Sequence, residues 1–249
     1  TMNLDIYCGP APTPDAIWSA WNFDPPLLLM IAAAFAILIT IASSLRQRLA
    51  ATAALIIMLV AFVSPLCALA SALFSARIFH HILIVSVLGP LIVIAIPLRL
   101  RAWRRLPPQL SFLVHTLSMW FWHAPEPYLL ALSSPVIYWL MELSLIGSAI
   151  WLWADILSPR RAAGSAIALL LGTTLQMGML GALLTFSRQP LFAAHMDTTL
   201  AFGLSPLADQ QLAGLLMWVP AALPYLFAAL LILRRVFAGR GLDGEASSR

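Results

Sequence analysis

Five histidines are the side chains of this sequence best suited to chemistry: His80, His81, His115, His123 and His195. A neutral imidazole nitrogen binds transition metals, and the ring exchanges protons near neutral pH. His115, Met119 and His123 follow one another at intervals of four residues, so on a helix they would share one face. That face would extend about 12 Å at a rise of about 1.5 Å per residue. The spacing therefore predicts a line of imidazole and thioether donors along one helix.

Imidazole combined with thioether is a donor set that suits copper, Cu(I) in particular, better than magnesium or calcium. Four methionines in or near the predicted outer halves of the last helices are further candidates: Met177, Met179, Met196 and Met217. His80 and His81 point about 100° apart on a helix, so at most one of them is expected to face inward. The sequence has no HxxxH or CxxC spacing, so each histidine could instead be a hydrogen-bonded structural residue. Core packing is the commoner role of a methionine.

Three other polar features are candidates for supporting roles. Asp209, which precedes two glutamines, is predicted to cap the N-terminus of the last membrane helix, where the helix dipole favours negative charge. Glu142 interrupts an uncharged stretch, so it should face the protein interior and find a partner there. Cys8 and Cys67 could form a disulfide, serve as two metal-binding thiols or be unrelated buried cysteines.

The elements that would position these side chains are membrane helices. Of the 249 residues, 61% are hydrophobic and 10% are charged, and the mean hydropathy of +0.92 is far above that of a soluble domain. A membrane-spanning helix needs about 20 predominantly apolar residues. Seven stretches meet or approach this length: 25–45, 49–76, 78–98, 106–125, 135–154, 162–187 and 210–233. We therefore predict an all-α fold, a polytopic bundle of seven transmembrane helices.

Prolines and glycines refine this prediction. Ser64-Pro65 in the second stretch predicts a kink or an end of the helix, followed by a re-entrant or interfacial piece. Small residues on the sixth and seventh helices predict a close approach between helices: Gly172, Gly178, Gly181 and Gly214. The predicted organisation is an extracytoplasmic segment at 1–24, a helical domain at 25–239 and a disordered cytoplasmic tail at 240–249.

The arginines predict the orientation in the membrane, because short cytoplasmic loops retain basic residues. With the N-terminus outside and the C-terminus inside, only Arg77 and Arg188 of the 14 basic residues are extracytoplasmic. The cytoplasmic set is Arg46, Arg48, Arg99, Arg101, Arg104, Arg105, Arg160, Arg161, Arg234, Arg235, Arg240 and Arg249. The net charge of +4 then indicates contact with anionic membrane lipid, and no nucleic-acid partner is predicted. Residues 1–24 contain neither the basic start nor the apolar core of a cleavable signal.

The motifs of soluble enzymes are missing from the sequence. It contains no nucleophile elbow, phosphate-binding loop, dinucleotide fingerprint or carboxylate pair. No enzymatic activity is therefore predicted.

Four groups of segments carry a family resemblance: YCGPAPTP with WNFDP, SARIFHHILIVSVLGPLIVIAIP, WHAPEPY, and LFAAHMDTTLAFGLSPLADQQLAGLLMWVP. They resemble the CtaG-like cytochrome c oxidase assembly factors of the integral membrane type, over essentially all seven predicted spans. The DQQLAGLLMW element is the most specific part, supported by His123-x-Pro and the spacing from His81 to Pro90. The resemblance implies a bacterial inner-membrane protein that assists maturation of haem-copper oxidases. Copper is the implied metal, and oxidase subunits or a copper donor are the implied partners.

The sequence departs from this family pattern at Arg77, Tyr138 and Glu142, where three potential histidine ligands are replaced. Members often carry His followed by Met at the outer end of the third helix, where this chain has Arg77-Ile78. Members also carry two histidines four residues apart in the fifth helix, where this chain has Tyr138 and Glu142. Either the remaining histidines hold copper in an altered coordination sphere, with methionine and Glu142, or the chain keeps only a scaffolding role.

Three functions are therefore compared. The leading hypothesis is an assembly factor that binds or hands over copper at an extracytoplasmic His and Met site. The alternative is a membrane scaffold or accessory subunit of a respiratory complex that binds no metal. The third is a small-solute or metal transporter, which would show broken helices with ionisable groups near the membrane midplane. Glu142 and His115 are the candidates for such groups.

Overall fold

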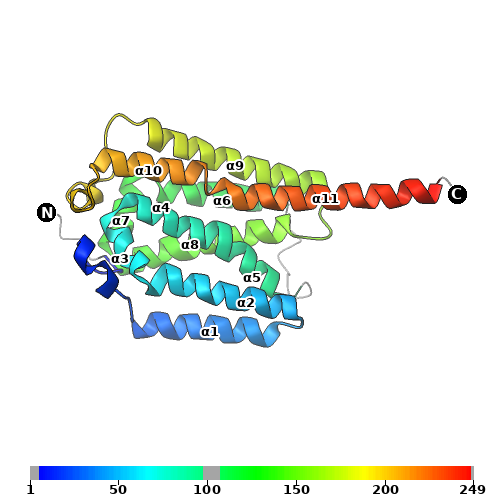
Figure 1. The fold of residues 1–249 in the computed structure, drawn as a ribbon, viewed down its shortest axis with the longest axis horizontal. Coiled ribbons are helices and arrows are strands. Elements are labelled where there is room, and N and C mark those ends of the chain that lie inside the picture. Colours follow the sequence, from blue (N-terminus) through cyan, green and yellow to red (C-terminus); the bar gives the residue numbers. More distant parts are fainter. Residues whose placement is uncertain (1–5, 98–106, 248–249) are drawn as a thin grey trace.

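The computed structural model describes residues 6–97 and 107–247, with side chains described as far as Ala238. Over these residues the chain forms helices and connecting turns, with no β-strand. The helices run roughly along the long axis of the molecule, with the N-terminal segment at one end and α11 extending beyond the other (Figure 1). The predicted all-α class is confirmed.

Many of the helices begin at a proline, which suits the first helical turn because its missing N–H would have no partner there. In chain order the α-helices are α1 (Pro25–Ile41), α2 (Leu45–Met58), α3 (Pro65–Ala72), α4 (Phe74–Ile82), α5 (Gly89–Ala95), α6 (Pro108–Trp122), α7 (Pro125–Ser133), α8 (Pro135–Ile156), α9 (Ala163–Phe186), α10 (Pro206–Trp218) and α11 (Ala222–Ser247). Two π-helical turns, η2 (Leu59–Val63) and η3 (Leu83–Leu88), extend α2 and join α4 to α5. Three 3-10 turns are η1 (Pro14–Ser19), η6 (Ala193–His195) and η7 (Thr199–Phe202).

Five helical segments of the described chain are long and apolar enough to cross a membrane: Leu45–Val63, Phe74–Ala95, Pro135–Ile156, Ala163–Phe186 and Pro206–Ala238. Helix α1 is apolar but has only 17 residues. Helix α6 has 15 residues, which is about 23 Å of helix against a hydrocarbon core of about 30 Å. The fold is that of a multi-pass membrane protein, and the count of seven spans stays a prediction.

The helix end predicted at Ser64-Pro65 is confirmed. The Ser64 N–H bonds to the carbonyl of Leu59, which closes the π-helical turn η2, and α3 then begins at Pro65. The uncharged stretch up to Ala76 is therefore divided among α2 with η2, α3 and the start of α4, because Pro65 has no N–H to extend the hydrogen bonds of the first helix. Helix α4 begins at Phe74, ahead of the predicted start at 78.

A wide helical turn lets one long helix accommodate Pro90. Helix α4, η3 and α5 follow one another without a break, and in η3 the Gly89 N–H bonds five residues back, to the carbonyl of Ile84. Pro90 has no N–H to offer the next carbonyl, that of Val85. This carbonyl accepts instead from Trp153 Nε1 of α8 at 3.1 Å. The bond joins the middle of this helix to α8.

The last predicted span is not one helix. Helix α10 begins at Pro206 and ends at Trp218, and α11 begins at Ala222. Pro220 lies in the turn between them, and a proline inside a helix removes a hydrogen bond and clashes with the preceding turn. The prediction of a continuous helix over 210–233 overlooked this effect. Helix α11 continues past residue 240, the predicted start of the tail, as far as Ser247.

Helices α9 and α10 are packed with their backbones in contact. A Cβ added to Gly214 would lie 2.5 Å from the carbonyl oxygen of Gly181 and 2.3 Å from Thr185 Oγ1. A Cβ on Gly181 would lie 2.8 Å from the carbonyl oxygen of Gly214. Only glycine permits such an approach, so the predicted close contact is confirmed at this pair.

A disulfide joins Cys8 of the N-terminal segment to Cys67 of α3. Of the three alternatives that the sequence left open, the bridge is therefore the one present. Tyr7 stacks on the ring of Tyr138 in α8, and its hydroxyl donates to Asp24. These contacts fix the N-terminal segment against the end of the bundle formed by α3 and the start of α8.

Basic side chains meet at the opposite end of the molecule. Arg46 at the start of α2, Pro159 after α8 and Arg235 of α11 line one cavity. This gathering agrees with the loop assignment predicted from the arginines. The predicted loop arginines Arg99, Arg101, Arg104 and Arg105 lie outside the described residues, as does Arg249, and the side chain of Arg240 is not among those described.

Candidate metal site

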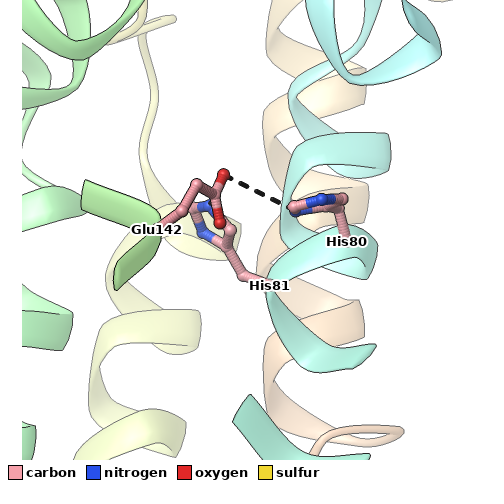
Figure 2. A group of neighbouring side chains, drawn as sticks. All are labelled: His80, His81 and Glu142. Carbon is pink, nitrogen blue, oxygen red and sulfur yellow. Dashed lines mark ion pairs between the residues drawn. The ribbon is translucent and has the colours of Figure 1, made fainter. Parts of the chain in front are cut away.

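The side chains of His80, His81 and Glu142 meet in the protein interior, where Glu142 of α8 reaches toward both histidines of α4 (Figure 2). One nitrogen or oxygen atom of each lies within 4.8 Å of those of the other two. Glu142 Oε1 is 3.8 Å from His80 Nδ1 and 3.6 Å from His81 Nε2. None of the three is more than 2% exposed. Two imidazoles and a carboxylate gathered away from water have the composition of a metal site.

Both adjacent histidines are buried, so the prediction that at most one of them faces inward is wrong. The π-helical turn η2 covers the other side of α4, where Phe62 packs edge-on against His80 with ring centroids 5.0 Å apart. A helix surrounded by neighbours buries more than one face. His81 points toward α6, as its contact with His123 shows.

His81 and His123 face each other through their ring nitrogens. His81 Nδ1 is 3.3 Å from Nε2 of His123, which follows the last residue of α6. His123 Nδ1 lies 2.7 Å from the carbonyl oxygen of Met119, and it must donate its hydrogen because a carbonyl only accepts. In the neutral ring, Nε2 then has no hydrogen, and its lone pair is directed at His81, where it accepts a hydrogen bond when His81 Nδ1 carries the proton. Metal-binding histidines typically donate their other ring N–H to a backbone carbonyl in this way.

Arg77 is fully buried beside the histidines, so its predicted place in an extracytoplasmic loop is wrong. Its Nη1 lies 3.5 Å from Glu142 Oε1 and donates to the Tyr138 hydroxyl at 3.4 Å. The guanidinium also lies over the Tyr138 ring, 5.3 Å from its centroid. The prediction assumed that a charged residue marks the end of a membrane span. A charged side chain that has a partner can instead be buried within the span. The prediction that Glu142 faces inward and finds a partner is confirmed.

His195 is held by a different partner. Its Nε2 lies 2.7 Å from the Tyr128 hydroxyl of α7, and its ring packs against Phe74. Burial, and next to it the positive charge of Arg77, lowers the pKa of His195 to about 3. Burial raises the pKa of Tyr128 to about 12. Both groups are therefore neutral at physiological pH, and of the predicted trio only His81 and His123 are brought into direct contact.

The remaining predicted donors are distributed over the molecule. His115 and Met119 are buried on the same face of α6 as predicted, but His115 Nδ1 bonds to Ser148 Oγ at 3.1 Å. Met217 is buried within α10. Met196 is 37% exposed, because the turn that directs His195 inward directs Met196 to the surface. The role of Met196 as a ligand stays a prediction.

Asp209 caps a helix, but not the one predicted. Its carboxylate accepts from the backbone N–H of Phe74 at 2.6 Å and of Ser75 at 3.2 Å, and from the Ser75 hydroxyl. These are unsatisfied donors at the start of α4. The cap of α10 is Ser205, whose side chain accepts from the N–H of Ala208. Asp209 thus fixes the start of the helix that carries the histidine pair.

Sequence reasoning gave no role to three residues that contact the cluster or its neighbours. Arg77 and Tyr138 stood out only as departures from a family pattern, and Tyr128 was not singled out. The sequence did contain a signal for Arg77. Tyr138 and Glu142 are four residues apart, so they share one face of a helix and can both contact the same buried cation.

The architecture is that of a multi-pass helical membrane protein with a buried imidazole cluster. Residues 40–238 match the family model of the cytochrome c oxidase caa3 assembly factor (Caa3_CtaG). The chain belongs to this family. No curated protein and no solved structure matches the chain.

Proposed function

We propose that this protein is a non-enzymatic membrane assembly factor for a cytochrome c oxidase that binds Cu(I) between His81 and His123. The observation that carries the proposal is the Nε2 lone pair of His123, which faces His81 Nδ1 at 3.3 Å. Copper is the cargo in this account, passed from a donor protein to an oxidase subunit.

The donor atoms suit this ion. Imidazole nitrogens bind first-row metals such as zinc at about 2.0 Å, so two of them on opposite sides of an ion would stand about 4 Å apart. The two nitrogens here are 3.3 Å apart. A small rotation of one imidazole ring would increase the separation of the two nitrogens from 3.3 Å to the distance that the ion needs. Cu(I) binds imidazole nitrogens well, whereas magnesium and calcium prefer oxygen ligands.

The charges near the pair favour Cu(I) over Cu(II). The cluster already contains one buried guanidinium, from Arg77, balanced by the carboxylate of Glu142. Cu(I) adds one positive charge and Cu(II) adds two, and uncompensated charge is costly in a low-dielectric interior. Glu142 would offset part of this cost, with its oxygen 3.6 Å from His81. His80 would stay close without being needed as a ligand.

The scaffold alternative has its own support in the structure. Arg77 and Glu142 balance each other's charge without any metal, with Tyr138 as a further hydrogen-bond partner. In that reading the buried cluster only stabilises the bundle, and the protein acts by contacting oxidase subunits.

Copper loading distinguishes the two functions. The purified full chain, loaded with Cu(I) without oxygen and passed through a desalting column, is expected to retain about one copper per chain. His123→Ala should retain much less. His115→Ala is the matched control, because this buried histidine of the same helix bonds to Ser148 and should leave the copper content unchanged. Equal, substoichiometric copper in all three proteins would reject the copper site and favour the scaffold.

A further inference from the structure

A cavity in two parts lies at the arginine-rich end of the bundle. One part has a volume of about 310 Å³, and its lining combines apolar residues with Ser44, Gln47, Arg46 and Arg235. The other has a volume of about 420 Å³ and is almost entirely apolar. Arg46, Ile94, Leu157 and Arg235 line both parts, so the two spaces adjoin.

The apolar part lies between membrane helices. Pro90 and Leu91 of α5 form one wall, and Phe227, Ala228 and Leu231 of α11 form the other. Small-molecule sites in proteins commonly have this size and this apolar character. The cavity therefore offers a slot for a hydrocarbon chain that runs along the helices.

Arg46 and Arg235, at the mouth of this cavity, carry positive charges that the described part of the protein does not neutralise by an ion pair. Both side chains are exposed. They come from separate helices, α2 and α11, yet they line the same space. Two arginines that line one space can together bind the oxygen atoms of a phosphate group.

We propose that this cavity binds one anionic phospholipid, with its phosphate between Arg46 and Arg235 and one acyl chain between α5 and α11. The charge of the mouth and the apolar character of the slot match the two ends of such a molecule. Basic pockets between membrane helices on the cytoplasmic side are suited to anionic headgroups. The bound lipid would connect α11 to α2 and α5, in addition to the packing of α11 on α9.

Native mass spectrometry of the full chain in detergent tests this site. The probes are phosphatidylglycerol and phosphatidylcholine with identical acyl chains. We expect one phosphatidylglycerol to be retained roughly tenfold more tightly than phosphatidylcholine. The double variant Arg46→Gln/Arg235→Gln should abolish that preference. Glycerol phosphate, which has the headgroup charge but no acyl chain, should not displace the bound lipid at equal concentration.

The control is the double variant Arg48→Gln/Arg234→Gln, which removes two neighbouring exposed arginines that do not line the cavity. It should keep the preference. Leu231→Trp, which enlarges a partly exposed residue that lines the apolar part, should weaken retention of both lipids while the copper content stays unchanged. Equal losses in the two arginine variants would overturn the proposal, because they would indicate diffuse attraction to the basic surface. Displacement by glycerol phosphate would also overturn it.

Discussion

At the scale of single residues, Arg77 determines what the buried histidines can do. It contacts both Tyr138 and Glu142. The guanidinium is thus a cation that belongs to the cluster itself, and the carboxylate of Glu142 balances its charge. Glu142 also lies close to His81, which faces the Nε2 lone pair of His123.

The ion pair makes a prediction about stability. Glu142→Gln leaves the Arg77 charge buried without its carboxylate, and removing one partner of a buried pair costs about 3–5 kcal/mol. Thermal unfolding of the purified protein in detergent measures this loss. Glu126→Gln, at an exposed carboxylate in the first turn of α7, should change the free energy of unfolding by less than about 0.5 kcal/mol.

A second variant separates charge from shape. In Arg77→Met/Glu142→Gln both charges are gone, so most of the lost stability should return. A double variant no more stable than Glu142→Gln alone would show that the contribution of the ion pair was misjudged.

At the scale of elements, close packing between α9 and α10 determines where the loop with His195 and the start of α10 lie. Gly214 and Gly181 let the two backbones touch, and Asp209 of α10 in turn caps α4. The start of the histidine-bearing helix therefore depends on a contact between two other helices.

Gly214→Ala tests this packing. The new Cβ would meet the Gly181 carbonyl oxygen at 2.5 Å, so the helices must separate, and overpacking of this kind costs about 1–3 kcal/mol. Gly147→Ala in α8 is the control, because a Cβ there meets nothing within 4 Å. It should be neutral or stabilise the helix by up to about 1 kcal/mol, since alanine favours helix over glycine. Both proteins are compared by thermal unfolding, and equal melting temperatures would contradict the assigned contact.

Much of this architecture was predictable from local chemistry. The Ser64-Pro65 helix end, the burial of Glu142 and the glycine contact between α9 and α10 each follow from one residue type in an apolar sequence. What failed depended on partners distant in sequence. Asp209 looked like a cap for its own helix, and its true partners in α4 are more than 130 residues away.

Arg77 and the cysteines show the same limit. Arg77 was predicted to lie at the edge of a span because its partner Glu142, which permits its burial, is 65 residues away in the sequence. The bridge between Cys8 and Cys67, with a sequence separation of 59, cannot be selected over free thiols without the fold.

At the scale of the whole molecule, the two ends differ in chemistry. The disulfide and the N-terminal segment lie at one end, and the cavity lined by Arg46 and Arg235 lies at the other. Disulfides persist in oxidising compartments, and arginine-rich loops stay in the cytoplasm. Both features agree with the predicted orientation, with the N-terminus outside, and the seven spans, α1 and α6 included, stay a prediction.

Reporter fusions test this orientation. A reporter fused after Arg235 is expected to be cytoplasmic. One inserted near Asp197, which is exposed in the turn between α9 and α10, is expected to be extracytoplasmic. Protease accessibility in intact and opened cells gives a control that does not depend on the reporter. Both sites on the same side of the membrane would refute the seven-span orientation.

The central claim is that copper is held by the imidazoles of His81 and His123 while the cysteines are bridged. Copper K-edge X-ray absorption of the Cu(I)-loaded full chain measures the ligands directly. The account predicts a first shell of nitrogen at about 2.0 Å, without a sulfur shell at about 2.3 Å, and loss of that signal in His123→Ala. A first shell made of sulfur, or a nitrogen shell unchanged in His123→Ala, would contradict it.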